Sequence, residues 1–170
     1  MFADKLAQRI KKFNNPTVVG LDPNLSFVPG FIREKVFREF GKTHKAVAEA
    51  FIEFNRKLID AVYDIVPAVK PQLAYYEMYG LEGMRAFYET VKYAKSKGLI
   101  VIADGKRNDI GTTAKAYSSA YLGTSPVGEL EESACDADAL TVNPYFGIDG
   151  IEPFINDCKS FGKGIFILVK

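Results

Sequence analysis

Oppositely charged residues crowd together directly after an apolar segment of this chain. Asp104, Lys106 and Asp109 lie in the stretch DGKRNDIGTT (residues 104–113), which follows the apolar run LIVIA (residues 99–103). Alternate side chains of a strand share a face, so we expect Asp104 and Lys106 to be neighbours at the tip of a buried strand. An ammonium held beside carboxylates can stabilise developing negative charge and donate a proton.

A second interpretation of the same stretch is structural. Asp104 and Lys106 would then form a strand-end ion pair, and Asp109 would cap a helix by accepting hydrogen bonds from the amides of Gly111 or Thr112. Most charged clusters in proteins are structural or solvated, so the residue types alone leave both interpretations open.

Strand-like and helix-like segments alternate along the chain. Short apolar runs rich in β-branched residues predict strands at residues 17–22, 65–70, 99–104, 139–143 and 165–170. Apolar residues spaced three or four apart predict helices within residues 1–13, 43–63 and 81–97, around residues 116–121, and over residues 151–158. This alternation indicates an α/β fold in which parallel strands are joined by helical crossovers.

Two architectures fit five such strands. One is an open doubly wound sheet, and the other is a (β/α)₈ TIM barrel of which this chain supplies about the first five βα units. Each predicted strand finishes in a polar residue, as in a barrel whose strands all send functional groups to one face: Asp22, Lys70, Asp104, Asn143 and Lys170. These strand ends favour the barrel.

The last predicted strand has no covering helix after it. Lys170 ends an apolar strand that would leave one face and one sheet edge unprotected. We therefore expect residues 1–170 to form one domain, the N-terminal part of a longer barrel whose C-terminal strands and loops are absent.

The composition is that of an ordinary globular chain. With 48% hydrophobic residues, a net charge of +1 and no concentrated basic patch, the chain is not expected to bind nucleic acid or a membrane surface. Its two cysteines, Cys135 and Cys158, belong to no metal-binding motif, which fits a reducing, cytoplasmic location. A small-molecule or protein partner is expected.

The stretch at residues 104–113 matches the pattern Asp-x-Lys-x-x-Asp-Ile-Gly, which resembles the signature of orotidine 5'-phosphate decarboxylases. Three further segments resemble the first, second and fourth strands of that family in its longer bacterial branch: VVGLDPN, AVKPQLAYYE and DALTVNPYFGIDGIEPF. The resemblance spans nearly the whole chain, and it favours the functional interpretation of the charged cluster.

The resemblance implies decarboxylation of orotidine 5'-phosphate to UMP in pyrimidine biosynthesis, without metal or cofactor. Lys106 would stabilise a carbanion at C6 and protonate it, and Asp104 would lie beside the substrate carboxylate. Asp22 and Lys70 would bind the ribose hydroxyls.

The resemblance also implies a homodimer with shared active sites. Asp109 and Thr113 would enter the active site of the neighbouring subunit. Asn143 lies at the end of a predicted strand, and we leave open whether it lines the pocket or caps a loop.

Some parts of the family pattern are missing from this chain. The family's pyrimidine-binding residue after the fifth strand and its phosphate-binding loops have no counterpart in it, so we expect the chain alone to be inactive. Two alternatives remain. One is a Mg²⁺-dependent sugar-phosphate decarboxylase or aldolase of the same suprafamily, against which the Ile-Gly-x-Thr continuation and Lys70-Pro71 argue. The other is a non-catalytic half-barrel.

Overall fold

The computed structural model describes residues 1–169 and contains a five-stranded sheet, seven helices and a separate hairpin within them. The sheet strands are β1 (Val18–Leu21), β2 (Ala68–Pro71), β3 (Ile100–Arg107), β6 (Ala139–Val142) and β7 (Gly164–Ile167). The helices are α1 (Phe2–Phe13), α2 (Gly30–Phe40), α3 (His44–Val62), α4 (Leu73–Glu77), α5 (Gly80–Ser96), α6 (Gly111–Tyr121) and α7 (Ile148–Phe161). The hairpin pairs β4 (Ser125–Val127) with β5 (Leu130–Glu132).

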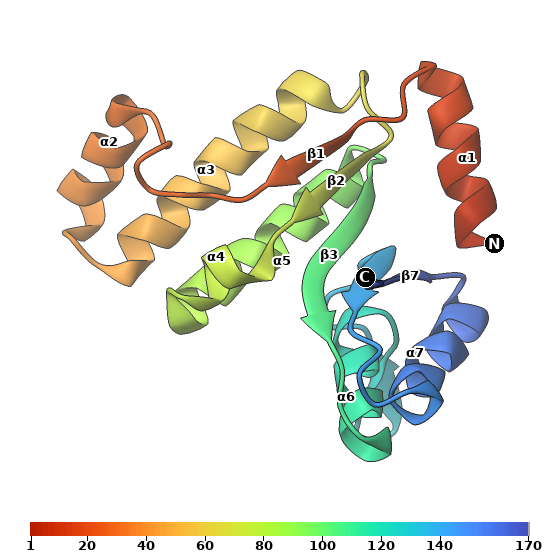
Figure 1. The fold of residues 1–170 in the computed structure, drawn as a ribbon. Helices are drawn as coiled ribbons and strands as arrows, with labels where there is room; N and C mark the ends of the chain where they lie inside the picture. The colour runs from red at the N-terminus through yellow and green to blue at the C-terminus, as the bar shows by residue number, and fades with distance from the viewer. Residues whose placement is uncertain (170) are drawn as a thin grey trace.

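The strand order of the sheet distinguishes the two candidate architectures. The order is β1-β2-β3-β6-β7, every neighbouring pair is parallel, and the sheet therefore follows the chain without a reversal (Figure 1). A doubly wound sheet reverses its strand order at a switch point, so that alternative is wrong. Successive strands laid down in one direction, with helices between them, form part of a barrel.

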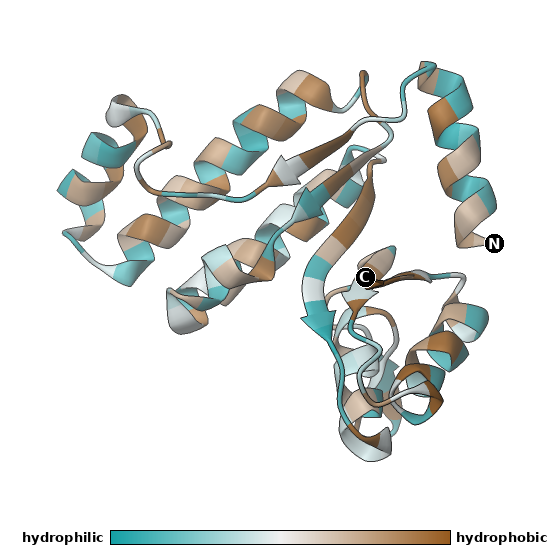
Figure 2. Cartoon of the chain, in the orientation of Figure 1, coloured by the Kyte–Doolittle hydropathy of each residue, from teal (hydrophilic) through white to brown (hydrophobic). Residues whose placement is uncertain are grey.

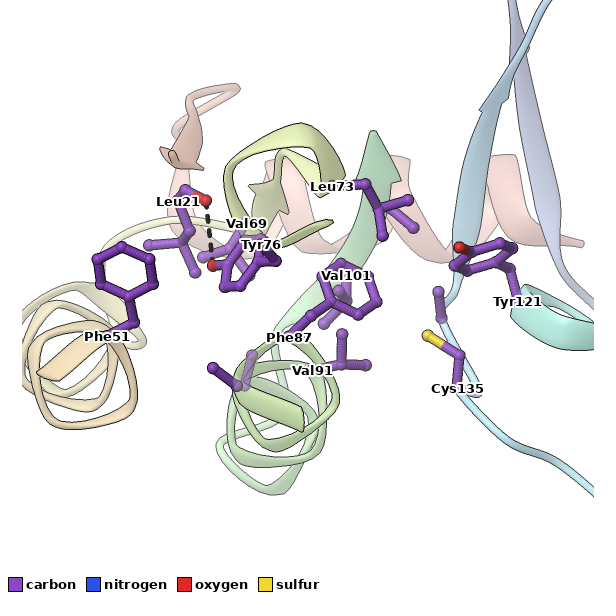
Figure 3. Close-up of a cluster of buried hydrophobic side chains, with 14 of the residues drawn as sticks. Leu21, Phe51, Val69, Leu73, Tyr76, Phe87, Val91, Val101, Tyr121 and Cys135 are labelled. Carbon is purple, nitrogen blue, oxygen red and sulfur yellow. Dashed lines mark hydrogen bonds between the residues drawn. The ribbon is translucent and has the colours of Figure 1, made fainter. Parts of the chain in front are cut away.

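The two faces of the sheet carry different packing. The outward face, which includes Val101 and Ala103, joins the main hydrophobic core under the crossover helices. Figure 3 shows this core, where Tyr76 of α4 lies among buried side chains and donates a hydrogen bond of 3.2 Å to the carbonyl of Leu21. Ile100 and Ile102 belong to a smaller cluster on the opposite face. The predicted alternation of β3 is therefore confirmed.

Helix α1 covers part of that smaller cluster. Phe2 and Leu6 pack against the buried residues Ala68, Ile100, Ile102 and Ala139. In Figure 1 this helix stands apart from the others, near the starts of the strands. The amphipathic N-terminal helix predicted from the sequence is confirmed. Among the described residues, no helix combines the length and hydrophobicity needed to cross a membrane.

Several predicted boundaries needed correction. Strand β3 continues to Arg107 and does not end at Asp104, and in Figure 2 its ribbon changes from hydrophobic to hydrophilic colours toward that end. Helix α6 begins at Gly111, five residues before the predicted position 116, and it buries Ala114, Ser118 and Tyr121, whereas Ala116 is exposed. Helices α2 and α4 and the β4–β5 hairpin were not predicted. Lys170 lies outside the described residues.

Candidate active site

The charged cluster lies where the carboxyl ends of β2, β3 and β6 meet, and an irregularity in β3 shapes it. Ala103 pairs with Leu140, but the next register pair is Arg107 with Val142, so β3 contains two extra residues between these points. Lys106 lies in this bulge with a φ of +50°, in the left-handed region that non-glycine residues adopt at an energetic cost. Bulges commonly redirect side chains next to active sites.

The Asp104 carboxylate is the centre of the cluster. Its Oδ1 accepts hydrogen bonds from the Lys106 ammonium at 2.7 Å and the Thr141 hydroxyl at 2.8 Å. Its Oδ2 accepts from the Lys70 ammonium at 2.8 Å and the Gln72 side-chain amide at 2.9 Å. Four donors therefore hold the carboxylate in one orientation.

These contacts determine the charge state of Asp104. Burial on its own raises the pKa of a carboxyl group, since it penalises the charged form. The hydrogen bonds from Lys106, Lys70 and Thr141 outweigh burial and lower the pKa of Asp104 from 3.8 to about 2. The carboxylate is therefore ionised at neutral pH.

The lysines reach toward solvent while Asp104 does not. The side chain of Asp104 is 9% exposed, whereas that of Lys106 is 47% exposed and that of Lys70 is 32% exposed. Each ammonium has three donor hydrogens, so both can keep Asp104 and still bind another oxygen or anion. The trio of two ammonium groups and one carboxylate has a net positive charge, which suits an anionic ligand.

Two predicted ligand-binding residues lie near this end of the sheet without joining the cluster. Asp22 directly follows β1 and is exposed, and within residues 1–169 no ion pair links it to a lysine. Asn143 follows β6, and its Oδ1 accepts a hydrogen bond from the amide of Tyr145 at 3.0 Å. This hydrogen bond fits the loop-capping interpretation of Asn143, and the pocket-lining one stays a prediction.

Asp109 and Thr113 also lie apart from Asp104. Helix α6 begins at Gly111 after Ile110 and has no side-chain cap, so the expectation that Asp109 caps Gly111 or Thr112 is wrong. Among residues 1–169, the Asp109 carboxylate accepts only from the amide of Ile110, at 2.8 Å. Thr113 is exposed in the first turn of the helix.

Sequence reasoning missed two members of the cluster. Gln72 lies two residues after Lys70, and Thr141 lies two residues before Asn143. In an extended strand each would share a face with the residue that was predicted. The period-two alternation could have pointed to both residues. Neither has a charge, however, and their contacts with Asp104 depend on how three strands align.

Comparisons with known proteins agree with this geometry. The sequence profile of the orotidine 5'-phosphate decarboxylase / HUMPS family matches residues 17–170. Two curated relatives are described as orotidine 5'-phosphate decarboxylases. The one from Caldicellulosiruptor saccharolyticus is 42% identical, and the match covers 99% of this chain and 55% of that protein. The one from Rhodopirellula baltica is 46% identical, and the match covers 99% of this chain and 54% of that protein.

Solved structures of proteins described in the same way have a similar fold. One from Streptomyces avermitilis has a TM-score of 0.76 at 30% identity, covering 98% of this chain and 52% of that one. One from Leishmania donovani has a TM-score of 0.72 at 29% identity, covering 99% and 53%. The chain spans about half the length of the relatives it matches. The barrel order of its strands, the charge array at their carboxyl ends and the matching profile agree, and the chain belongs to the orotidine 5'-phosphate decarboxylase / HUMPS family.

Proposed function

We propose that the protein containing this segment converts orotidine 5'-phosphate to UMP, using no metal or cofactor. The observation that carries the proposal is the Lys70–Asp104–Lys106 array at the strand tips of a chain of this family. Because the chain spans about half the length of its relatives, the activity is proposed for the product of the complete reading frame. The location proposed for it is the reducing cytoplasm, which suits two free cysteines.

The chemistry requires stabilisation of a localised charge. When the bond between C6 and the carboxylate breaks, its electron pair stays on C6 in the plane of the pyrimidine, where the ring π system cannot delocalise it. The Lys106 ammonium stabilises this charge and then transfers a proton to C6, so CO₂ leaves and a hydrogen replaces it. Asp104 holds the ammonium in position at 2.7 Å.

Binding of the remainder of the substrate involves the neighbouring strands. Lys70 uses one donor on Asp104 and keeps others for a ribose hydroxyl. Asp22 is exposed at the end of β1, two strands away from Asp104, where it can accept from the same sugar. Binding energy at the ribose would position C6 against Lys106 and so assist the chemical step.

The proposed active unit is a homodimer in which Asp109 and Thr113 reach the partner's site. Within the described part of its own chain the Asp109 carboxylate bonds only to the next backbone amide, which leaves it able to accept from another subunit. Gly150 lies against both Asp109 and Phe146, which brings Asp109 beside an exposed apolar loop that includes Tyr145 and Phe146. Exposed apolar patches of this kind often mark protein interfaces.

The test is a comparison of wild type with Lys106→Ala in the product of the complete reading frame. We expect the variant to lose at least about 10³-fold in kcat, because both charge stabilisation and proton donation depend on this ammonium. Conversion of orotidine 5'-phosphate to UMP measures activity, and thermal unfolding verifies the fold. Lys92→Ala, on an exposed position of α5, is the matched control and should behave as wild type.

The same assay separates the alternatives. Full activity of wild type in a chelator is expected, whereas activity that depends on added Mg²⁺, with a sugar phosphate as the preferred substrate, would favour the sister enzymes. Undiminished turnover in Lys106→Ala would overturn the proposal.

A further inference from the structure

Thr141 of β6 makes two hydrogen bonds that connect the main elements of the charged cluster. Its hydroxyl accepts from the backbone amide of Lys106 at 2.9 Å and donates to Asp104 Oδ1 at 2.8 Å. A hydroxyl has one proton and two lone pairs, so it can form both bonds at once. Thr141 is buried, with 9% of its surface exposed.

The bond to the Lys106 amide compensates for the bulge in β3. This amide lies between Ala103 and Arg107, where two extra residues interrupt the regular pairing of β3 with β6. A backbone amide that is partly withdrawn from water destabilises the folded state when it lacks an acceptor. The threonine hydroxyl supplies the acceptor at the residue that has the left-handed backbone.

The hydrogen bond from Thr141 to Asp104 affects the position of the Lys106 ammonium. Oδ1 is shared by the Thr141 hydroxyl and the Lys106 ammonium, so the rotation of the carboxylate determines where the ammonium lies. The contacts form a closed ring that runs from the Lys106 amide through the Thr141 hydroxyl and Asp104 Oδ1 to the Lys106 ammonium. The Thr141 hydroxyl thus holds the backbone of Lys106 directly and its ammonium through the Asp104 carboxylate.

We propose that Thr141 is a positioning residue that holds the Lys106 ammonium in place for proton transfer. The inference rests on the proposed function, because it assigns Thr141 a part in the decarboxylation. The threonine does not itself touch the reacting atoms; it acts through the backbone and the carboxylate. A valine at this position would preserve shape and remove both hydrogen bonds.

The experiment compares Thr141→Val with Thr141→Ser, which retains the hydroxyl, in the product of the complete reading frame. We expect kcat to fall about 10- to 100-fold in the valine variant with KM changed less than about 3-fold, since misplacement of a reacting group acts on the chemical step. The serine variant should recover most of kcat. Thr90→Val is the matched control, because Thr90 is also buried and its hydroxyl donates to the carbonyl of Ala86 at 2.8 Å, within α5.

A second readout does not depend on turnover. The charged groups that contact Asp104 are Lys70 from β2 and Lys106 from β3, while its partners Thr141 and Gln72 are neutral. Asp22, the acidic residue after β1, makes no hydrogen bond with this carboxylate in the described part of the chain. Loss of the Thr141 donor should therefore raise the pKa of Asp104, measured by ¹³C NMR titration, in the valine variant but not in the serine or Thr90→Val variants.

The outcomes separate the two proposals. An inactive wild type would refute the proposed function, and the NMR titration would still decide whether Thr141 holds Asp104. An active wild type with unchanged kcat and unchanged Asp104 titration in Thr141→Val would overturn the positioning role. Should the valine variant fail to fold, Thr141→Ser against Thr141→Ala provides the same contrast.

Discussion

A single carboxylate, Asp104, organises the proposed chemistry. Two ammonium groups and two neutral donors surround it, and its burial would be costly without them. Removing one donor leaves the buried carboxylate incompletely paired. The loss of stability is then larger than the contribution of a single hydrogen bond. The contacts that stabilise Asp104 therefore also position the Lys106 ammonium.

The stability of the protein should depend on the ionisation of Asp104. Its folded pKa of about 2 lies below the ordinary value of 3.8, so its stabilising contribution is complete above pH 3.8 and is lost as pH falls toward 2. We expect wild type to exceed Asp104→Asn by on the order of 1–2 kcal/mol in unfolding free energy near neutral pH, allowing for partial screening by solvent. Urea unfolding between about pH 5 and about pH 2 should show this difference shrinking. A constant difference would contradict it.

The tip of β3 is the element on which the site depends. Arg107 turns to the outer face, where its Nη1 donates to the Gly105 carbonyl at 3.0 Å and its Nη2 reaches Tyr121 of α6 and Glu77 of α4. Its guanidinium also lies 5.6 Å from the ring centroid of Tyr117. The strand tip is thus fastened to two helices on one side while Thr141 holds it on the other.

Arg107→Lys should destabilise the protein although charge is conserved. A lysine cannot bind Glu77, Tyr121 and the Gly105 carbonyl together, and it stacks less well on an aromatic ring. We expect a loss of about 1–3 kcal/mol in the free energy of unfolding, measured with urea. Arg56→Lys is the control, because the Arg56–Glu89 pair is exposed and should contribute less than about 1 kcal/mol. Equal effects of the two substitutions would refute the role given to Arg107.

The sequence predicted the strands better than the details of the site. Strong apolar runs identified the five sheet strands, and the period of three or four identified α3 and α5 within one or two residues, since burial of one face imposes these patterns. Helix α4 was missed because it has only five residues, and the β4–β5 hairpin because its strands have three residues each and are mostly exposed.

The charged cluster, too, has a part that the sequence could predict and a part that it could not. Asp104 and Lys106 could be paired from alternation within one strand, which is local information. The approach of Lys70 to Asp104, the bulge at Lys106 and the contacts of Thr141 depend on the register between strands that are far apart in sequence. Tertiary contacts of this kind leave no period in the sequence.

At the scale of the molecule, the two ends of the sheet serve different purposes. At the starts of the strands Asp138 accepts from the Val101 amide at 2.9 Å and pairs with Lys5 at 2.6 Å, which ties α1 to the sheet. At the carboxyl ends lie the Asp104 cluster and exposed apolar loops. Barrels of parallel strands generally divide in this way, with stability at one end and chemistry at the other.

The proposed dimer predicts that two inactive proteins restore activity together. If Lys106 serves its own subunit and Asp109 serves the partner, a heterodimer of Lys106→Ala and Asp109→Ala contains one site with both changes and one with neither. Random exchange of equal amounts makes half of the dimers mixed, so about one quarter of wild-type activity is expected after exchange.

A second mixture distinguishes a shared site from simple stabilisation by the partner. Asp104 and Lys106 lie in one cluster of a single subunit, so every site in a heterodimer of Asp104→Ala and Lys106→Ala keeps one change. This mixture should stay inactive, and differently tagged subunits would verify exchange in both experiments. Recovery in both mixtures, or in neither despite complete exchange, would contradict the assignment of Asp109 to the partner's site. Recovery in the first mixture alone is expected only if catalytic groups cross the interface.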